Sequence, residues 1–88
     1  MSDEQSATGV RAVVEVLARA LTDRPDQVAV TEKPHKGGTL VELFVGSGEL
    51  GRVIGRQGRT AAALRTLASA AGEREGKTVT LEIRDGRP

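Results

Sequence analysis

Glycine recurs through the centre of this 88-residue chain, at positions 46, 48, 51, 55 and 58. Glycine adopts left-handed backbone conformations easily and weakens the interior of a helix. The segment Gly46-Ser47-Gly48 is therefore expected to end a strand, and Gly55-Arg56-Gln57-Gly58 is expected to interrupt a helical pattern. These breaks predict a strand, a short helix, a bend and a second helix in succession.

Periodic apolar residues predict one helix and two strands before this centre. The helix begins at Thr8 and ends at Thr22-Asp23-Arg24-Pro25, because proline disfavours helical geometry at the residue before it. Strands are predicted at residues 27–31 and 39–45, joined by a hairpin connection at residues 33–38 that contains proline and glycine. The apolar stripe of the helix comprises Val10, Val13, Val14, Leu17, Ala18 and Leu21.

Two helices and a strand are expected after the second predicted strand. A short helix fits residues 49–54, and a longer, alanine-rich helix runs from Arg59 to about Arg74. Residues 78–84 alternate between apolar and polar and predict a last strand. The order α-β-β-α-α-β predicts an α+β domain with helices on one face of a three-stranded sheet. One domain is expected over residues 7–86, after a disordered tail at residues 1–6.

Composition argues against several classes of protein. Cysteine is absent, so disulfides and thiolate metal ligands are excluded. No apolar stretch approaches the roughly 20 residues of a membrane span, and residues 1–5 do not resemble a signal peptide, so a cytoplasmic location is expected. No paired carboxylates, nucleophile–base set or metal cluster stands out, so neither catalysis nor a cofactor is expected. His35 is a lone histidine in the predicted turn and is expected to be exposed.

Positive charge is concentrated in one part of the chain. The net charge is +1, yet residues 50–72 contain Arg52, Arg56, Arg59 and Arg65 and no acidic residue. The remaining residues include nine Lys or Arg and twelve Asp or Glu. Local fields decide partners more than the total charge does. The charge alone is compatible both with an anionic partner and with an ordinary solvated helix face.

Two nucleotide-binding patterns overlap the glycine-rich segment. Residues 46–51 match G-x-G-x-x-G, which indicates a dinucleotide site when one helix and then a parallel strand follow. A second helix is expected here instead, and Glu73, near the offset of a ribose contact, falls at a helix end. Residues 46–52 also imitate a phosphate loop, but Val53 stands where a magnesium-binding hydroxyl is needed. A nucleotide-using enzyme would depend on the glycines at 46, 48 and 51.

The bend at residues 55–58 offers a different kind of anion site. Two glycines three positions apart permit positive φ angles and leave no Cβ in the path of a phosphate. The helix that begins at Arg59 would direct its free N–H groups and its dipole toward the same point. Arg56 and Arg59 add positive charge there. A plain corner between two helices has the same pattern, so the bend alone is a weak signal.

Residues 53–64, Val-Ile-Gly-Arg-Gln-Gly-Arg-Thr-Ala-Ala-Ala-Leu, resemble the signature of KH domains, in which an apolar residue and G-x-x-G precede small or aliphatic helix positions. The element order resembles the bacterial, type II KH fold. The resemblance covers residues 10–83 and is strongest to small bacterial single-KH RNA-binding proteins of the KhpA kind. Ala61 departs from the larger aliphatic residue of many KH domains, which implies a shallower groove.

The resemblance implies binding of single-stranded RNA. KH domains clamp about four nucleotides, with the G-x-x-G loop against the RNA backbone and the bases along an apolar groove. Ile54, Ala61 and Leu64 belong either to that groove or only to the core. The residues expected to contact RNA are Gly55, Arg56, Gln57, Gly58, Arg59, Arg52, Ile54, Thr60, Ala61 and Leu64, with Arg65 as a further basic residue.

Phe44 is the only aromatic residue, so stacking worth roughly 1–3 kcal/mol per base is nearly absent. This argues against an RRM and predicts weak binding with modest base preference.

The resemblance further implies a homodimer, or a heterodimer with a larger KH-containing protein linked to cell elongation. It also implies a role as RNA chaperone or post-transcriptional regulator. The alternative is a KH-fold adaptor, dimerising or ribosome-associated, with little RNA affinity of its own.

Overall fold

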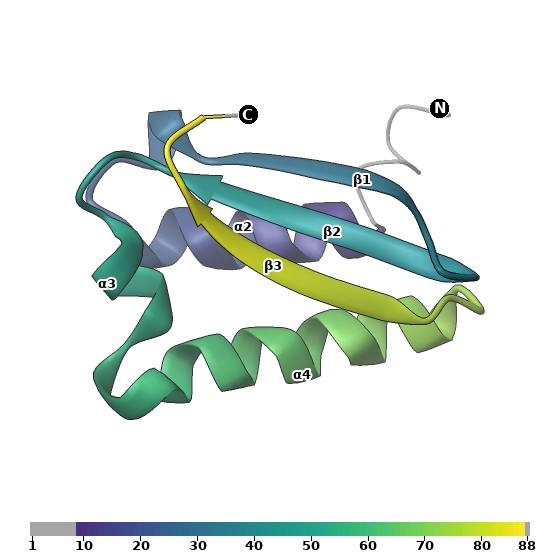
Figure 1. The fold of residues 1–88 in the computed structure, drawn as a ribbon. Helices are drawn as coiled ribbons and strands as arrows, with labels where there is room; N and C mark the ends of the chain where they lie inside the picture. Colours follow the sequence, from purple (N-terminus) through teal and green to yellow (C-terminus); the bar gives the residue numbers. More distant parts are fainter. Residues whose placement is uncertain (1–8, 88) are drawn as a thin grey trace.

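The computed structural model describes residues 9–87, so the tail expected at residues 1–6 lies outside the described residues. The observed order confirms the predicted α-β-β-α-α-β arrangement (Figure 1). The domain limits expected at residues 7 and 86 stay a prediction. In chain order the elements are α2 (Val10–Leu21), the 3-10 turn η1 (Pro25–Gln27), β1 (Ala29–His35), β2 (Gly38–Val45), α3 (Leu50–Ile54), the 3-10 turn η2 (Arg56–Gly58), α4 (Arg59–Arg74) and β3 (Val79–Asp85).

The three strands form one mixed sheet in the order β1-β2-β3. β1 pairs antiparallel with β2, whereas β3 pairs parallel with β2 because two helices carry the chain back to the opposite end of the sheet. Helices α2 and α4 pack on the same face of the sheet (Figure 1). The predicted fold class, α+β with helices on one face, is confirmed.

The core lies between that face and the helices. Alternate residues of β2 point inward and are fully buried, as the period of two along a strand requires. They meet the apolar stripe of α2, the buried face of α4 and Leu81 of β3. At Gly72 of α4 a Cβ would clash with the Val79 Cγ2, so α4 approaches β3 closely because this position has no side chain. The inward residues of β2 are Val41, Leu43 and Val45.

The hairpin between β1 and β2 differs from the prediction. The connection expected at residues 33–38 is wrong, because strand pairing continues through His35 and Gly38. Only Lys36 and Gly37 form the turn, with φ angles of +50° and +78°. Pro34 is tolerated inside β1 because β1 is an edge strand, where one N–H per pair of residues faces outward. His35 is half-buried rather than exposed, because it belongs to the strand.

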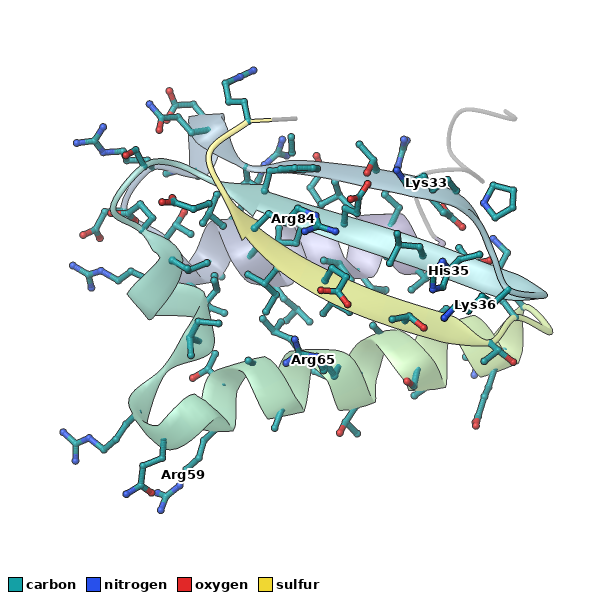
Figure 2. The ribbon with its side chains drawn as sticks, viewed as in Figure 1. Lys33, His35, Lys36, Arg59, Arg65 and Arg84 are labelled. Carbon is teal, nitrogen blue, oxygen red and sulfur yellow. The ribbon has the colours of Figure 1, made fainter. Side chains whose placement is uncertain are left out.

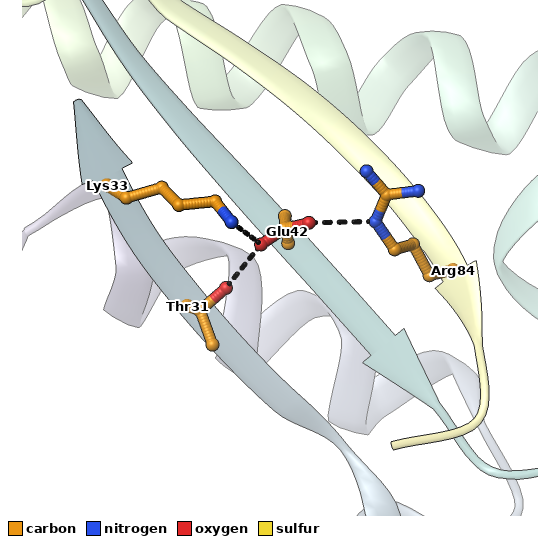
Figure 3. Close-up of polar contacts among 4 residues, drawn as sticks. All are labelled: Thr31, Lys33, Glu42 and Arg84. Carbon is orange, nitrogen blue, oxygen red and sulfur yellow. Dashed lines mark hydrogen bonds and ion pairs between the residues drawn. The ribbon is translucent and has the colours of Figure 1, made fainter. Parts of the chain in front are cut away.

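The opposite face of the sheet carries a charged network centred on Glu42 of β2 (Figure 3). The Glu42 carboxylate accepts hydrogen bonds from the Thr31 hydroxyl at 3.1 Å and from Arg84 Nε at 2.9 Å, and Lys33 Nζ lies 3.2 Å away. These contacts come from both neighbouring strands and leave Glu42 only 8% exposed. Phe44, on the same face, is 7% exposed. The only Phe, Tyr or Trp side chain of the protein is therefore covered and offers no stacking surface.

Residues 9–87 contain neither a membrane-spanning helix nor a cluster of metal ligands. None of the helices there combines the length and apolar character that crossing a membrane requires. In the same residues, no three His, Asp or Glu side chains converge as potential metal ligands.

Candidate nucleic-acid interface

A sharp bend separates α3 from α4, as the sequence predicts. α3 ends at Ile54, and the Gly55 N–H donates a last helical hydrogen bond to the Gly51 carbonyl at 2.9 Å. Gly55 then has φ +76° and ψ 174°, a combination that only glycine adopts readily. A Cβ at Gly55 would also clash with the Thr60 hydroxyl oxygen. Both the backbone angles and the neighbouring side chain therefore require glycine here.

The bend continues through two left-handed residues, Gln57 at φ +58° and Gly58 at φ +73°. The Gly58 N–H donates to the Gly55 carbonyl at 3.1 Å and closes the turn. Apart from the adjoining residues, no heavy atom of the described chain lies within 4 Å of the place that a Gly58 Cβ would take. Arg56 and Gln57 are exposed. The bend is therefore an open surface and not a buried corner.

Helix α4 begins directly at this bend with an uncapped N-terminus. Its N-cap residue is Gly58, which has no side chain to accept hydrogen bonds, and its first turn contains no acidic residue. The Arg59 N–H donates to the Arg56 carbonyl, but the next N–H groups of a first helical turn have no partner within the helix, and the helix dipole places partial positive charge at this end. The start of this 16-residue helix therefore favours an anion.

The arginines near the bend differ in whether an acid neutralises them. Arg52 donates a hydrogen bond to the Asp23 carboxylate at 2.5 Å. Arg59 donates to the Gln57 side-chain oxygen at 2.9 Å, which is a neutral acceptor, and projects outward from the start of α4 (Figure 2). Within residues 9–87, neither Arg56 nor Arg59 forms an ion pair. Two arginines therefore remain available to an anion at the bend.

Residues 11–83 match the family model of the KhpA/KhpB KH domain. The chain belongs to this KH family. RNA-binding protein KhpA of Aquifex aeolicus is 46% identical over 76 residues, which cover 86% of this chain and 96% of that protein. RNA-binding protein KhpA of Treponema pallidum is 45% identical over 73 residues, which cover 83% of this chain and 91% of that protein.

One solved structure shares the fold of this chain. The crystal structure of Aquifex aeolicus Era, the Y63A variant bound to GDP and AlF4−, aligns with a TM-score of 0.59 over 86% of this chain. The identity is 19%, and the aligned part spans 29% of the Era chain. At this identity the match shows a shared fold alone.

The residues expected to contact bases beside the bend differ in how far they are buried. Ala61 and Leu64 are each 3% exposed, and Leu64 belongs to the core cluster. Ile54 and Thr60 are half-buried and keep part of their surface toward solvent. The fold therefore places Ala61 and Leu64 beneath the surface near the bend and leaves Ile54 and Thr60 partly accessible.

The other glycine pattern, at residues 46–51, has a different environment. A Cβ at Gly46 would clash with the Gln27 side chain, which covers this glycine. The Glu49 carboxylate stands at the start of the five-residue α3 and accepts a hydrogen bond from the Asp23 N–H at 2.7 Å. A phosphate at this position would meet a buried carboxylate. The geometry therefore favours neither nucleotide pattern, although β3 does run parallel to β2.

The sequence did not predict the partner of Arg52 or the direction of the Arg65 side chain. The pairing of Arg52 with Asp23 joins residues 29 positions apart, and nothing in the sequence marks Asp23 as its partner. Arg65 points into the space between α4 and β3 (Figure 2). Its spacing of six residues from Arg59 places the two about 9 Å apart along the axis but on different sides of the helix, so the spacing alone did not predict a common surface.

Proposed function

We propose that this chain binds single-stranded RNA at the bend of residues 55–58 and at the first turn of α4. The proposal rests on one observation, the uncapped start of α4 at an exposed two-glycine bend beside Arg56 and Arg59. The relatives named above are RNA-binding proteins, and this supports RNA as the anion. Catalysis and a cofactor form no part of the proposal.

In this proposal the bend holds the RNA backbone. Phosphate oxygens accept hydrogen bonds from the N–H groups of the first turn of α4 that follow Arg59, and the missing side chain of Gly58 lets the strand approach. Arg56 and Arg59 supply positive charge, and the Gln57 side chain orients Arg59 through their hydrogen bond. Arg52 contributes less, because Asp23 already neutralises it.

The bases lie against the apolar surface next to the bend. Ile54 and Thr60 are accessible enough to contact them, whereas Ala61 and Leu64 support this surface from beneath. Because Phe44 is buried and is the only Phe, Tyr or Trp of this chain, stacking on bases is scarce and the base preference is modest. Three phosphate contacts give a slope of about −2 in log affinity against log salt for a single strand.

The biological role that follows is that of an RNA chaperone or post-transcriptional regulator in the cytoplasm. Weak contacts with modest base preference suit a protein that engages many transcripts briefly. Several weak domains acting on one RNA gain affinity through their high effective concentration. This proposed biological role is separate from the proposed RNA binding at the bend. Crosslinking to cellular RNA, with the contact residues mapped, tests both.

The direct test replaces Arg56 and Gln57 together with Asp. Aspartate accepts the left-handed backbone of position 57, so the fold is expected to survive. The matched control replaces the exposed Arg24 and Ser47 with Asp, which makes the same change in charge away from the bend. We expect the first variant to lose single-stranded RNA binding and the control to retain it, with unchanged circular dichroism in both. Equal affinities in two folded variants would refute the proposal.

A second candidate activity, self-association, is favoured by an apolar groove between α2 and α4. The groove has a volume of about 220 Å³. Two of its residues, Leu21 and Leu67, are 37% and 46% exposed. The groove is lined by Leu17, Ala20, Leu21, Thr60, Ala63, Leu64 and Leu67.

We propose that a second copy of this chain covers the groove. In a two-fold pair the groove of each copy, which includes the half-exposed Leu67, lies against the same groove of the other copy, so both are covered at once. Sedimentation of Leu67→Asp is expected to show a monomer where the native chain is a dimer, and Val16→Asp, an exposed position outside the groove, is expected to stay dimeric. A native monomer would contradict the homodimer, and pairing only with another KH-containing protein would support the heterodimer instead.

A further inference from the structure

Lys36 occupies the hairpin tip in a backbone conformation that suits other residues better. Its φ angle of +50° is left-handed, and Gly37 follows at +78°. Turns of this two-residue kind favour Asn-Gly or Gly-Gly, because a longer side chain is strained in the left-handed region. The Lys36 side chain is exposed and supports no buried packing. The fold therefore does not explain the choice of lysine.

Lys36 is also one of the eight cations that form no ion pair within residues 9–87. Arg19, Lys33, Arg52, Lys77 and Arg84 all form ion pairs. Within residues 9–87, Lys36, Arg56, Arg59 and Arg65 form none. Elsewhere in that range the cations without ion pairs are Arg11, Arg24, Arg74 and Arg87.

Three of these free cations follow one path across the molecule. Arg59 lies at the bend, Arg65 points between α4 and β3, and Lys36 extends from the hairpin across the beginning of β3 (Figure 2). The hairpin is fixed there, because the Thr39 N–H donates to the Thr78 carbonyl at 2.8 Å just before β3 begins. The bend and the hairpin tip therefore lie at opposite ends of α4, whose 16 residues span about 24 Å.

We propose that Lys36 is a second phosphate-binding point, which holds RNA that leaves the bend along α4 and β3. Arg65 contacts the strand between the two points. This inference rests on the proposed RNA binding at the bend and adds a length requirement to it. A strand of about four nucleotides occupies the bend alone, whereas a longer strand also reaches Lys36.

The test compares Lys36→Gly and Lys36→Arg on a short and a long homopolymeric RNA, of about four and about ten nucleotides. Glycine suits the left-handed position, so Lys36→Gly removes the charge without harming the fold, and thermal unfolding checks this. We expect Lys36→Gly to bind the long RNA several-fold more weakly, with a salt slope shallower by about 0.7, and to bind the short RNA normally. Lys36→Arg and the control Arg24→Gln are expected to match the native protein on both.

The outcomes separate this inference from the proposal on which it rests. Native affinity and slope of Lys36→Gly on the long RNA would overturn the second point and leave binding at the bend intact. An equal loss on both lengths would also overturn it, because Lys36 would then belong to the bend site. If the Asp substitutions at 56 and 57 leave the affinity for the short RNA unchanged, the proposed function itself fails.

Discussion

The Arg52 guanidinium donates to the Asp23 carboxylate at 2.5 Å, in an ion pair that joins α3 to the loop after α2. Both side chains are more than half exposed, so the pair adds less than about 1 kcal/mol to stability. Its larger effect is electrostatic. It neutralises an arginine three residues before the bend while Arg56 and Arg59 remain free.

Replacing Asp23 with Asn is expected to raise the affinity for single-stranded RNA. The change frees Arg52 for a phosphate, so binding at low salt should strengthen several-fold and the salt slope should steepen by about 0.7. Asp26→Asn removes an exposed acid from the same loop and is the control for general charge effects. Adding Arg52→Gln to Asp23→Asn should cancel the gain. Equal gains in Asp23→Asn and Asp26→Asn would show that Arg52 plays no specific part.

The two glycines of the bend are expected to respond differently to alanine. Gly55→Ala meets the Thr60 Cβ at 2.7 Å and has disallowed backbone angles, so a loss of more than about 2 kcal/mol in unfolding free energy is expected. Gly58→Ala meets open space and has only the left-handed penalty of about 1–2 kcal/mol. Urea unfolding measures both. Equal losses would contradict the assigned role of Thr60.

Two glycines inside helices give a further matched pair. Gly72→Ala would press its Cβ into Val79 and should destabilise the protein by about 1–3 kcal/mol, despite the better helix propensity of alanine. Gly51→Ala, in α3, meets open space and should stabilise it by about 0.5–1 kcal/mol. Thermal unfolding distinguishes these signs. A stabilising Gly72→Ala would mean that α4 does not approach β3 as closely as described.

The network around Glu42 predicts a pH dependence of stability. Hydrogen bonds from Lys33 and Arg84 hold the pKa of the Glu42 carboxyl below its ordinary value of 4.5. The ionised form is thus favoured in the folded state, so the stabilisation is complete above pH 4.5 and is lost as the pH falls through the lowered pKa. Glu42→Gln should therefore be less stable than the native protein at neutral pH, and the difference should shrink below pH 4.5.

Urea unfolding across this pH range measures the effect. Glu82→Gln is the control, because Glu82 is the exposed partner of Glu42 in the register of β3. A destabilisation by Glu42→Gln that stays constant with pH would contradict the role of the ionised carboxylate.

Local patterns were sufficient to predict the bend and the order of the elements. The glycines of residues 55–58 act through their own backbone angles, which depend little on the rest of the fold. The apolar stripe of α2 and the alternation of β2 likewise identify the surfaces that meet in the core. The hairpin was placed wrongly because Pro34 suggests a turn, and its tolerance in β1 depends on the edge position that only the assembled sheet defines.

The ion pairing and the burial of each site residue were harder to predict, because they depend on contacts between distant segments. Arg52 and Arg56 look equivalent in the sequence, yet one is paired with Asp23 and the other is free of ion pairs within residues 9–87. Leu64 and Ile54 are both apolar, and only the packing of α4 against the sheet decides that Leu64 belongs to the core. For Lys36, the sequence predicted only a place in the hairpin connection.

The amide signals of the bend give the most direct test of RNA binding there. In a nuclear magnetic resonance titration of the full chain with single-stranded RNA, the largest shifts should fall on the backbone N–H groups of residues 55–60, because a phosphate at the bend changes the environment of all of them. Unmoved signals at these residues, with shifts confined to the α2–α4 groove or to the face of the sheet around Glu42, would contradict the account.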